Sequence, residues 1–269
     1  WESRLTIGVD PGTGKQIRRS FSGKTQREVR EKMQAAAVAV NDSTYQEPSK
    51  LTVSEWLDIW LAEYTGAVKP LTRSTYKNKV ESAIKPALGA VKLQMLKAPQ
   101  IQKMLNDLQR GTSGRKPLSA KTVKDIYGIL HRALGQAVEV GYLRINPSDA
   151  CKLPRVERQE IRPLDEAQTA AFLNAIHGQP FERLFIVDLL TGLRQGELLG
   201  LRWKDVDFDA GTVTVAQQLL KSKEKCGAYF FGSLKNDKTR LLTPASSVMK
   251  ALREQRRGQT GWRLKAGGV

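Results

Sequence analysis

Residues 191–203 read TGLRQGELLGLRW, and this stretch decides the fold of the second half of the chain. It follows an apolar run over 181–190, which is expected to form a buried helix. Glycine at 192 permits a sharp backbone reversal after that helix, because it has no Cβ. A second, short helix over 195–201 should follow, and then the run TVTV (212–215) predicts a strand.

Arg194 stands on that reversal. The short helix would be anchored through Leu198, Leu199 and Leu201, leaving Arg194 at its N-terminus, where backbone N–H groups and the helix dipole favour an anion. An arginine suits a phosphodiester at such a place, because its planar fork bonds two phosphate oxygens at once. Taken alone, Arg194 would be read as a surface arginine at a helix cap.

The charge of the chain points to a polyanionic partner. The 269 residues carry 44 Lys and Arg against 27 Asp and Glu, a formal net charge of +17. That much positive charge repels itself unless a polyanion neutralises it, so nucleic acid is the expected partner. A membrane surface fits poorly, since the apolar run noted near the middle, residues 184–187, is far too short for a span. Hydrophobic residues make up 40% of the chain, which favours a folded protein.

Neither the cysteines nor the histidines suggest a metal site. Cys151 and Cys226 lack metal-ligand spacing and are too few for a disulfide framework, so both are interpreted as free thiols in a reducing compartment. His131 and His177 have no Cys or carboxylate cluster beside them in sequence. The sequence therefore predicts neither a metal nor a cofactor, and a cytoplasmic location.

The expected fold class is mainly α with small β-sheets (α+β). Turn and linker signals divide the chain into a β-hairpin-plus-helix module over 1–42, a linker over 43–50, an all-helical domain over 51–147, a linker over 148–162 and a mixed α/β domain over 163–269. The first module is small enough to suggest that a strand is missing upstream of it.

Capping residues and apolar spacing predict the individual elements. In the first module, strands are expected over 4–9 and 16–21 and a helix over 24–40. In the helical domain, Thr52 or Ser54 caps a first helix, a second begins near Thr72, and Ser119 caps a long one. Asp165 opens the third module with a capping box. Its later elements are expected to be strands near 211–217, 227–232 and 240–243, and a basic helix from 249 that turns glycine-rich and breaks off.

The string TGLRQGELLGLRWKDVDF resembles the first arginine motif of tyrosine recombinases and phage integrases. In that family this arginine belongs to a cluster that holds the scissile phosphate. The resemblance implies this catalytic role for Arg194, and it matches Glu197 and Asp205 to positions that brace the motif.

A second stretch, SLKNDKTRLLTP (233–244), resembles the family's lysine-bearing β-hairpin. Lys235 falls on the lysine position, from which an ammonium at a hairpin tip would protonate the leaving 5′ oxygen. The family prefers threonine directly after this lysine, whereas Asn236 stands here. Lys238 could reach the same phosphate, and residues 236–239 also fit an ordinary turn.

The resemblance extends over nearly the whole chain. Residues 51–147 look like the family's core-binding (SAM-like) domain, and the hairpin-plus-helix looks like its arm-binding module. In the family these modules and the catalytic domain form a clamp around duplex DNA, and the protein self-associates on DNA as a tetramer. The basic residues then expected to face phosphates are Arg18, Arg19, Lys69, Arg73, Lys77, Lys79, Lys121, Lys124, Lys238 and Arg240.

Family chemistry also needs a tyrosine nucleophile and a His-x-x-Arg pair, and neither is visible after Pro244. Tyr229, the last tyrosine, precedes the lysine segment and lies on an expected strand. The catalytic domain is therefore interpreted as partial, in a chain that binds DNA without cutting it. Two alternatives remain open: a truncated recombinase that acts only as a DNA-binding protein, and a basic RNA-binding protein.

Overall fold

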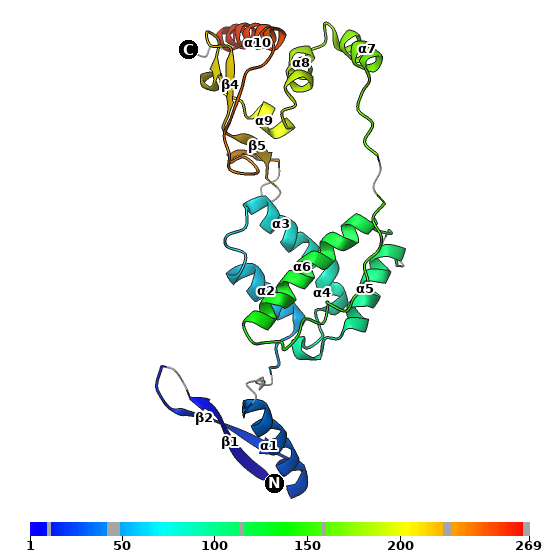
Figure 1. The fold of residues 1–269 in the computed structure, drawn as a ribbon, viewed down its shortest axis with the longest axis vertical. Coiled ribbons are helices and arrows are strands. Elements are labelled where there is room, and N and C mark those ends of the chain that lie inside the picture. Colours follow the sequence, from blue (N-terminus) through cyan, green and yellow to red (C-terminus); the bar gives the residue numbers. More distant parts are fainter. Residues whose placement is uncertain are drawn as a thin grey trace. The chain divides into compact units, whose positions relative to one another are not determined.

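The computed structural model describes residues 1–9, 12–41, 49–112, 114, 116–157, 160–222 and 227–265, without the side chains at 39 and 263. Linker positions 43–48, Cys226 and positions 158–159 and 266–269 lie outside the described residues. The chain divides into two compact units, residues 1–157 and 158–269. The fold is mainly helical with small antiparallel sheets, which confirms the predicted α+β class (Figure 1).

The first unit begins with a two-stranded antiparallel hairpin. Strand β1 (Glu2–Val9) pairs with β2 (Gln16–Ser22), and helix α1 (Gln26–Asn41) packs on the hairpin. Alternate residues of β1 are half-buried, as the period of a strand requires. Val29 and Ala36 of α1 are buried, so the helix supplies the apolar face that two strands lack.

Residues 51–151 of the first unit build one helical core. Its elements are α2 (Val53–Glu63), α3 (Pro70–Lys79), the π-helical turn η1 (Val80–Ile84), α4 (Lys85–Leu88), the 3₁₀ turn η2 (Leu93–Met95), α5 (Ala98–Arg110) and α6 (Ala120–Glu139). Thr52 caps α2 in a reciprocal box with Glu55, and Ser119 caps α6. Trp56 is fully buried in the core and donates its ring N–H to the Ala133 carbonyl at 2.9 Å.

The second helix of this bundle differs from the sequence prediction in two ways. It begins at Pro70 rather than near Thr72, because a proline at the first helical position loses no hydrogen bond. It is also interrupted by η1. Pro86 has no N–H to donate, and the Lys85 N–H reaches back five residues to the Val80 carbonyl, which widens the helix locally.

The second unit combines helices with two small sheets. Its elements are α7 (Glu166–Ile176), α8 (Glu182–Thr191), α9 (Gln195–Leu199), the 3₁₀ turn η3 (Trp203–Asp205), β3 (Val206–Asp207), β4 (Thr212–Val215), β5 (Gln218–Lys221), β6 (Tyr229–Gly232), β7 (Arg240–Leu242) and α10 (Ser246–Lys265). Strands pair in the order β3-β4-β7 in one sheet, and β5 pairs with β6 in another. Val187 of α8, Val213 of β4 and Val248 of α10 lie in one buried cluster, so both helices pack against the three-stranded sheet.

Three expectations for this unit were wrong. Helix α8 is only half-buried: Val187 is its one buried residue in the described part of the chain, because the helix packs mainly against α10. Helix α10 starts at Ser246 and continues through Gly258 and Gly261 instead of breaking off, since tertiary packing overrides the low helix propensity of glycine. Strand β5 was not expected at all. Among the described residues, no helix is both long enough and apolar enough to cross a membrane.

Candidate functional site

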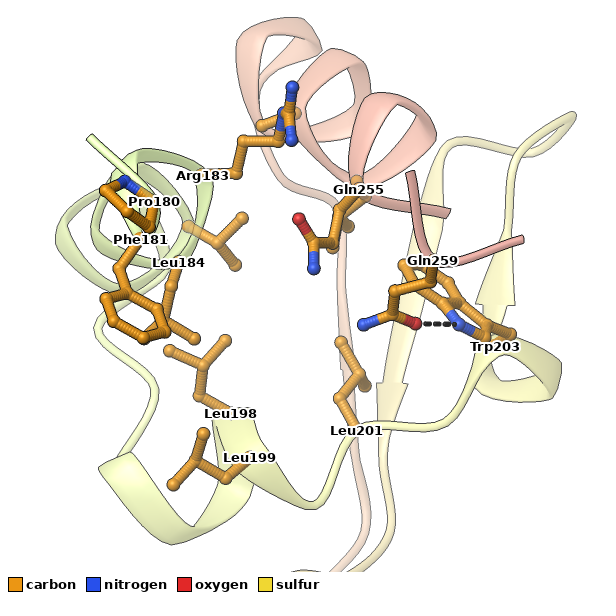
Figure 2. A pocket seen from close by; sticks show the side chains of 13 residues that line it. Pro180, Phe181, Arg183, Leu184, Leu198, Leu199, Leu201, Trp203, Gln255 and Gln259 are labelled. Carbon is orange, nitrogen blue, oxygen red and sulfur yellow. Dashed lines mark hydrogen bonds between the residues drawn. The ribbon is translucent and has the colours of Figure 1, made fainter. Parts of the chain in front are cut away.

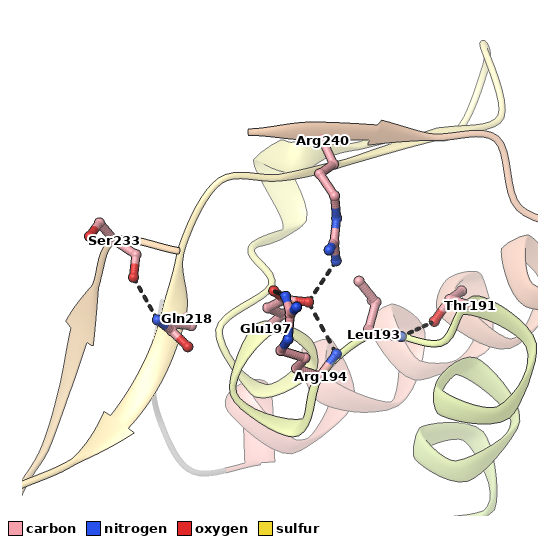
Figure 3. Close-up of polar contacts among 7 residues, drawn as sticks. All are labelled: Thr191, Leu193, Arg194, Glu197, Gln218, Ser233 and Arg240. Atoms are coloured by element: carbon pink, nitrogen blue, oxygen red, sulfur yellow. Dashed lines mark hydrogen bonds and ion pairs between the residues drawn. The ribbon is translucent and has the colours of Figure 1, made fainter. Parts of the chain in front are cut away.

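The reversal before Arg194 is built as the sequence suggests. Helix α8 ends at Gly192 in the left-handed conformation (φ 61°), and the Gly192 N–H donates to the Asp188 carbonyl at 2.9 Å. The Thr191 hydroxyl donates to the Val187 carbonyl at 2.5 Å and accepts the Leu193 N–H at 3.4 Å (Figure 3). Leu193 then turns into the interior. Arg194 follows it and leaves 54% of its side chain exposed.

Glu197 is the polar centre of the site. Its side chain is 1% exposed, and its carboxylate contacts two arginines. One oxygen accepts from Arg194 Nη1 at 2.8 Å, and the other accepts from Arg240 Nη2 at 2.6 Å and from the Arg194 backbone N–H at 3.1 Å (Figure 3). Burial by itself raises the pKa of this carboxyl, but the hydrogen bonds from Arg194 and Arg240 outweigh it, so the pKa lies below its ordinary value. Glu197 is therefore a carboxylate at neutral pH.

Arg240 comes to this carboxylate from strand β7. It lies opposite Val215 in the β4–β7 register, and its side chain extends toward α9. Its Nε is buried and has no hydrogen-bond partner in the described part of the chain. The sequence prediction assigned Arg240 to DNA, whereas the structure places its guanidinium on Glu197.

Lys235 lies in an exposed turn after β6. The expected hairpin tip was wrong: β6 pairs with β5 and β7 pairs with β4, so Lys235 stands on the connection between the two sheets. Asp237, two residues on, adopts a positive φ of 54°, a conformation that aspartate tolerates in turns. Lys238 is exposed beyond it.

The residues that directly precede Arg194 and Lys235 lie in one small apolar cluster. Leu193, Val215 and Leu234 are buried against one another, and each predicted catalytic residue directly follows one of these leucines. The corner after α8 and the turn after β6 therefore meet over the end of β4. This neighbourhood was not readable from the sequence, in which the two residues are far apart.

Asp205 does not contact Arg194 or Glu197 in any hydrogen bond of the described residues; its partner lies in the turn that follows α9. It forms a two-point ion pair with Arg202, with Nε to Oδ2 at 2.5 Å and Nη2 to Oδ1 at 3.0 Å. This pair fixes the turn η3, which leads from the arginine helix into β3. Asp205 thus stabilises the route of the chain after the motif.

Sequence reasoning missed two glycines of the motif. A Cβ on Gly196 would lie 2.9 Å from the Leu219 carbonyl oxygen, and one on Gly200 would lie 2.8 Å from the Leu219 nitrogen. Helix α9 therefore packs directly on the backbone of β5. The signal was present, because glycines four apart share one face of a helix.

The helix that follows Arg194 is short, with only five residues in α9. Leu199 is also exposed, so the helix is anchored by Leu198 and by its glycine face instead.

The other basic residues predicted to face DNA lie on three elements of the first unit. Arg18 and Arg19 are on β2, Lys121 and Lys124 are on α6, and the remaining four are at or on α3: Lys69, Arg73, Lys77 and Lys79. Arg73 donates to the Leu61 carbonyl at 3.0 Å, and Lys121 pairs with Asp125 at 2.9 Å. These two are therefore partly committed to internal contacts.

In the residues that the structure describes, no group of three or more His, Cys, Asp or Glu side chains could hold a metal. Each histidine has a single carboxylate partner, which its sequence neighbourhood did not reveal: His131 contacts Asp149 at 2.9 Å, and His177 contacts Glu182 at 3.1 Å. Burial raises the pKa of the free Cys151 thiol.

A pocket of about 290 Å³ opens between α8, α9 and α10 (Figure 2). Its lining is mostly apolar, with Leu184, Leu198 and Leu201 pointing inward, and Gln259 accepts the Trp203 ring N–H at 2.9 Å. Arg183 is the one charged residue of the lining, and it contacts Glu254 at 3.4 Å. Among the described residues that line it, none is a carboxylate, a histidine or a cysteine.

Comparison with known proteins gives matches over both units. The model of the phage integrase N-terminal SAM-like domain matches residues 52–109, and the phage integrase family model matches residues 162–261. A XerC-like tyrosine recombinase of Caldanaerobacter subterraneus subsp. tengcongensis is 31% identical over 283 residues, which cover 98% of this chain and 70% of that protein.

Two further matches are longer than this chain. An integrase of Streptomyces ambofaciens is 29% identical over 209 residues, which cover 77% of this chain and 52% of that protein. A Tn1549 transposon integrase, solved in complex with transposon right end DNA, has a TM-score of 0.67 at 25% identity. That match covers 76% of this chain and 64% of the solved one. The chain thus spans between half and two thirds of these two proteins.

Proposed function

Because this chain belongs to the phage integrase family of tyrosine recombinases, we propose that it binds duplex DNA at recombination sites and grips one backbone phosphate with Arg194. The observation that carries the proposal is the half-exposed guanidinium of Arg194, anchored at one nitrogen by the buried Glu197 carboxylate. An arginine held in this way is oriented before the phosphate arrives, and such preorganisation is what makes electrostatic stabilisation effective.

The remaining donors of Arg194 suit a phosphate. Within the described residues, Nη1 is the guanidinium nitrogen that is bonded to protein, so the edge formed by Nε and Nη2 is left for two phosphate oxygens. Arg194 and Arg240 bring two positive charges to one carboxylate, so this cluster keeps a net positive charge for a phosphodiester.

Lys235 is proposed as the general acid for the leaving 5′ oxygen. Its turn adjoins the arginine corner through Leu193 and Leu234, which supports a shared phosphate. A lysine is suited to this step because its ammonium carries transferable protons on a flexible stem, whereas arginine stays protonated.

The covalent step of the family, which forms a 3′-phosphotyrosyl link, needs a tyrosine nucleophile. Tyr229 lies on β6 with 61% of its surface exposed, and Lys221 lies over its ring at 6.0 Å. We assign the nucleophile to no residue of this chain, and propose that the 269 residues bind DNA without cutting it. Self-association on DNA and action in the cytoplasm of a bacterial cell belong to the same proposal.

Salt-dependent binding to a labelled DNA duplex tests the phosphate grip. Arg194→Ala is expected to lower affinity about tenfold, since a charged hydrogen-bonded contact is lost. It should also reduce the slope of log K against log salt by about 0.9, the value for one phosphate contact. Lys235→Ala should act in the same direction. The matched control is Arg183→Gln, whose arginine is also paired with a carboxylate and 44% exposed.

Two outcomes would overturn the proposal: equal affinity for the duplex and for a structured RNA hairpin, or an unchanged affinity and salt slope in Arg194→Ala. The non-cutting part is tested with a nicked suicide duplex, on which a cleaving recombinase becomes covalently trapped. Trapped product with this chain would show that it contains a nucleophile after all.

A further inference from the structure

We propose that Arg240 is a positioning residue of the phosphate site, which acts through Glu197 rather than by touching DNA. It holds the carboxylate that orients Arg194, and it ties the arginine corner to the segment that carries Lys235. This inference rests on the proposed function, because it concerns how the same phosphate grip is kept in shape.

The carboxylate geometry gives the first argument. Each Glu197 oxygen faces a different arginine: Oε1 accepts from Arg194 Nη1 at 2.8 Å, and Oε2 accepts from Arg240 Nη2 at 2.6 Å. Figure 3 shows that the two arginines reach Glu197 from different elements, Arg240 from β7 and Arg194 from the start of α9. Contacts to both oxygens restrict rotation of the carboxylate. With that rotation restricted, the direction of the Oε1 contact limits where the Arg194 guanidinium can lie.

Burial gives the second argument. Glu197 is 1% exposed, and a buried carboxylate is stable only if its oxygens are compensated. Without Arg240, Oε2 would keep the hydrogen bond from the Arg194 backbone N–H at 3.1 Å and would lose its shorter contact, the one from Arg240 at 2.6 Å. The carboxylate would then rotate toward solvent or take up a proton, and either change weakens its hold on Arg194.

The strand register gives the third argument. Arg240 lies opposite Val215 on β4, and Val215 is buried with Leu193 and Leu234. These two leucines immediately precede Arg194 and Lys235. The Arg240 backbone is therefore paired with a residue of the cluster that adjoins both predicted catalytic residues. Its side chain connects β7 to α9 through the contact with Glu197.

The Arg240 side chain is also poorly placed to serve as a phosphate contact. Its Nη2 donates to Glu197 at 2.6 Å, its Nε is buried, and 39% of the side chain is exposed. Arg194, by comparison, is 54% exposed and is committed at one guanidinium nitrogen within the described residues. Of the two arginines on this carboxylate, Arg194 faces outward and Arg240 supports it.

A double-mutant cycle on duplex DNA separates positioning from direct contact. The variants are Arg194→Ala, Arg240→Gln and the double variant, with Arg183→Gln as control, each titrated at several salt concentrations. We expect Arg240→Gln to lose most of the roughly tenfold factor that Arg194→Ala loses. We expect the double variant to lose no more than Arg194→Ala and to have the same salt slope. If the Arg240–Glu197 ion pair were purely structural, Arg194→Ala would still lower the affinity about tenfold in the Arg240→Gln background.

Direct contact of Arg240 with DNA would overturn the proposal. In that case the two losses multiply in the double variant, and the salt slope falls by about a further 0.9. An Arg240→Gln variant that binds like the parent would overturn it equally. If Arg194→Ala itself leaves binding unchanged, Arg194 does not bind a phosphate. That result would overturn the proposed function, whatever the role of Arg240.

A second variant keeps the test decisive if Arg240→Gln does not fold, which hydrogen exchange in β4 and β7 would reveal. Arg240→Lys keeps a cation for Glu197 but provides a single point of contact. It is expected to fold and to retain part of the Arg194-dependent affinity, again without further loss in combination with Arg194→Ala. Multiplying losses in that pair would refute the positioning role.

Discussion

Replacing Gly200 by alanine tests how tightly the arginine helix is seated on β5. The new Cβ would lie 2.8 Å from the Leu219 nitrogen and 2.9 Å from the carbonyl carbon and Cα of Gln218. These are backbone atoms, so no side chain can swing away to make room. Helix α9 or strand β5 must move, and Gly200 itself is not in a conformation that alanine avoids (φ −90°).

The expected magnitude follows from two opposing effects. Overpacking of this kind typically costs about 1–3 kcal/mol. Alanine in place of glycine contributes up to about 1 kcal/mol in the opposite direction inside a helix, and less at a helix end such as this one. We therefore expect Gly200→Ala to lower the free energy of unfolding of residues 158–269 by about 1–2 kcal/mol.

Hydrogen exchange followed by mass spectrometry is the suitable assay, because it reports peptides of each unit separately. The matched control is Gly128→Ala, since Gly128 lies within α6 and a Cβ there would meet nothing within 4 Å. That change should raise the stability of the first unit by about 0.5–1 kcal/mol. A Gly200→Ala variant at least as stable as the parent would refute the reasoning about α9 and β5.

Two further changes address the ionisation of the site and the helical core. The pKa of Glu197 is lowered in the folded chain, so its stabilising contribution is present above about pH 4 and is lost as the pH falls through the folded-state value. The urea midpoint of the second unit should therefore fall less steeply with acid in Glu197→Gln than in the parent, and parallel curves would contradict this. Trp56→Phe removes the bond to Ala133 and part of a buried ring, and should cost about 2–4 kcal/mol in the first unit, whereas exposed Trp262→Phe should have little effect on stability by the same exchange measurement.

Local signals account for the parts of the fold that the sequence predicts well. Thr52, Ser119 and Asp165 each begin a helix as expected, because a cap is satisfied within three residues of itself. The pairing of β5 with β6 was not predicted, because strand partners are set by the arrangement of the whole sheet and not by local sequence. The length of α10 also escaped, because packing on α8, rather than its own composition, carries the helix past its glycines.

The candidate site likewise contains residues that a local motif predicts and one contact that it does not. Arg194 and Glu197 stand three residues apart in one motif, and both are found from the motif alone. Arg240 reaches Glu197 across 43 positions, through a strand register that no local pattern encodes. The sequence predicts a DNA contact for Arg240 from its basic stretch, and the contact with the buried Glu197 carboxylate is the observation from which we propose a positioning role instead.

A buried negative charge at the centre of a chain with net charge +17 has a physical consequence for phosphate binding. Arg194 and Arg240 would repel each other if they converged alone, and each would then need solvent or DNA to stay in place. Glu197 removes that repulsion, because it attracts both guanidinium groups while it is shielded from water. Arg194 can therefore be held in one orientation in the absence of DNA. On the proposed function, a phosphate therefore meets donors that need little rearrangement, which is the condition under which fixed charges stabilise a bound anion most strongly.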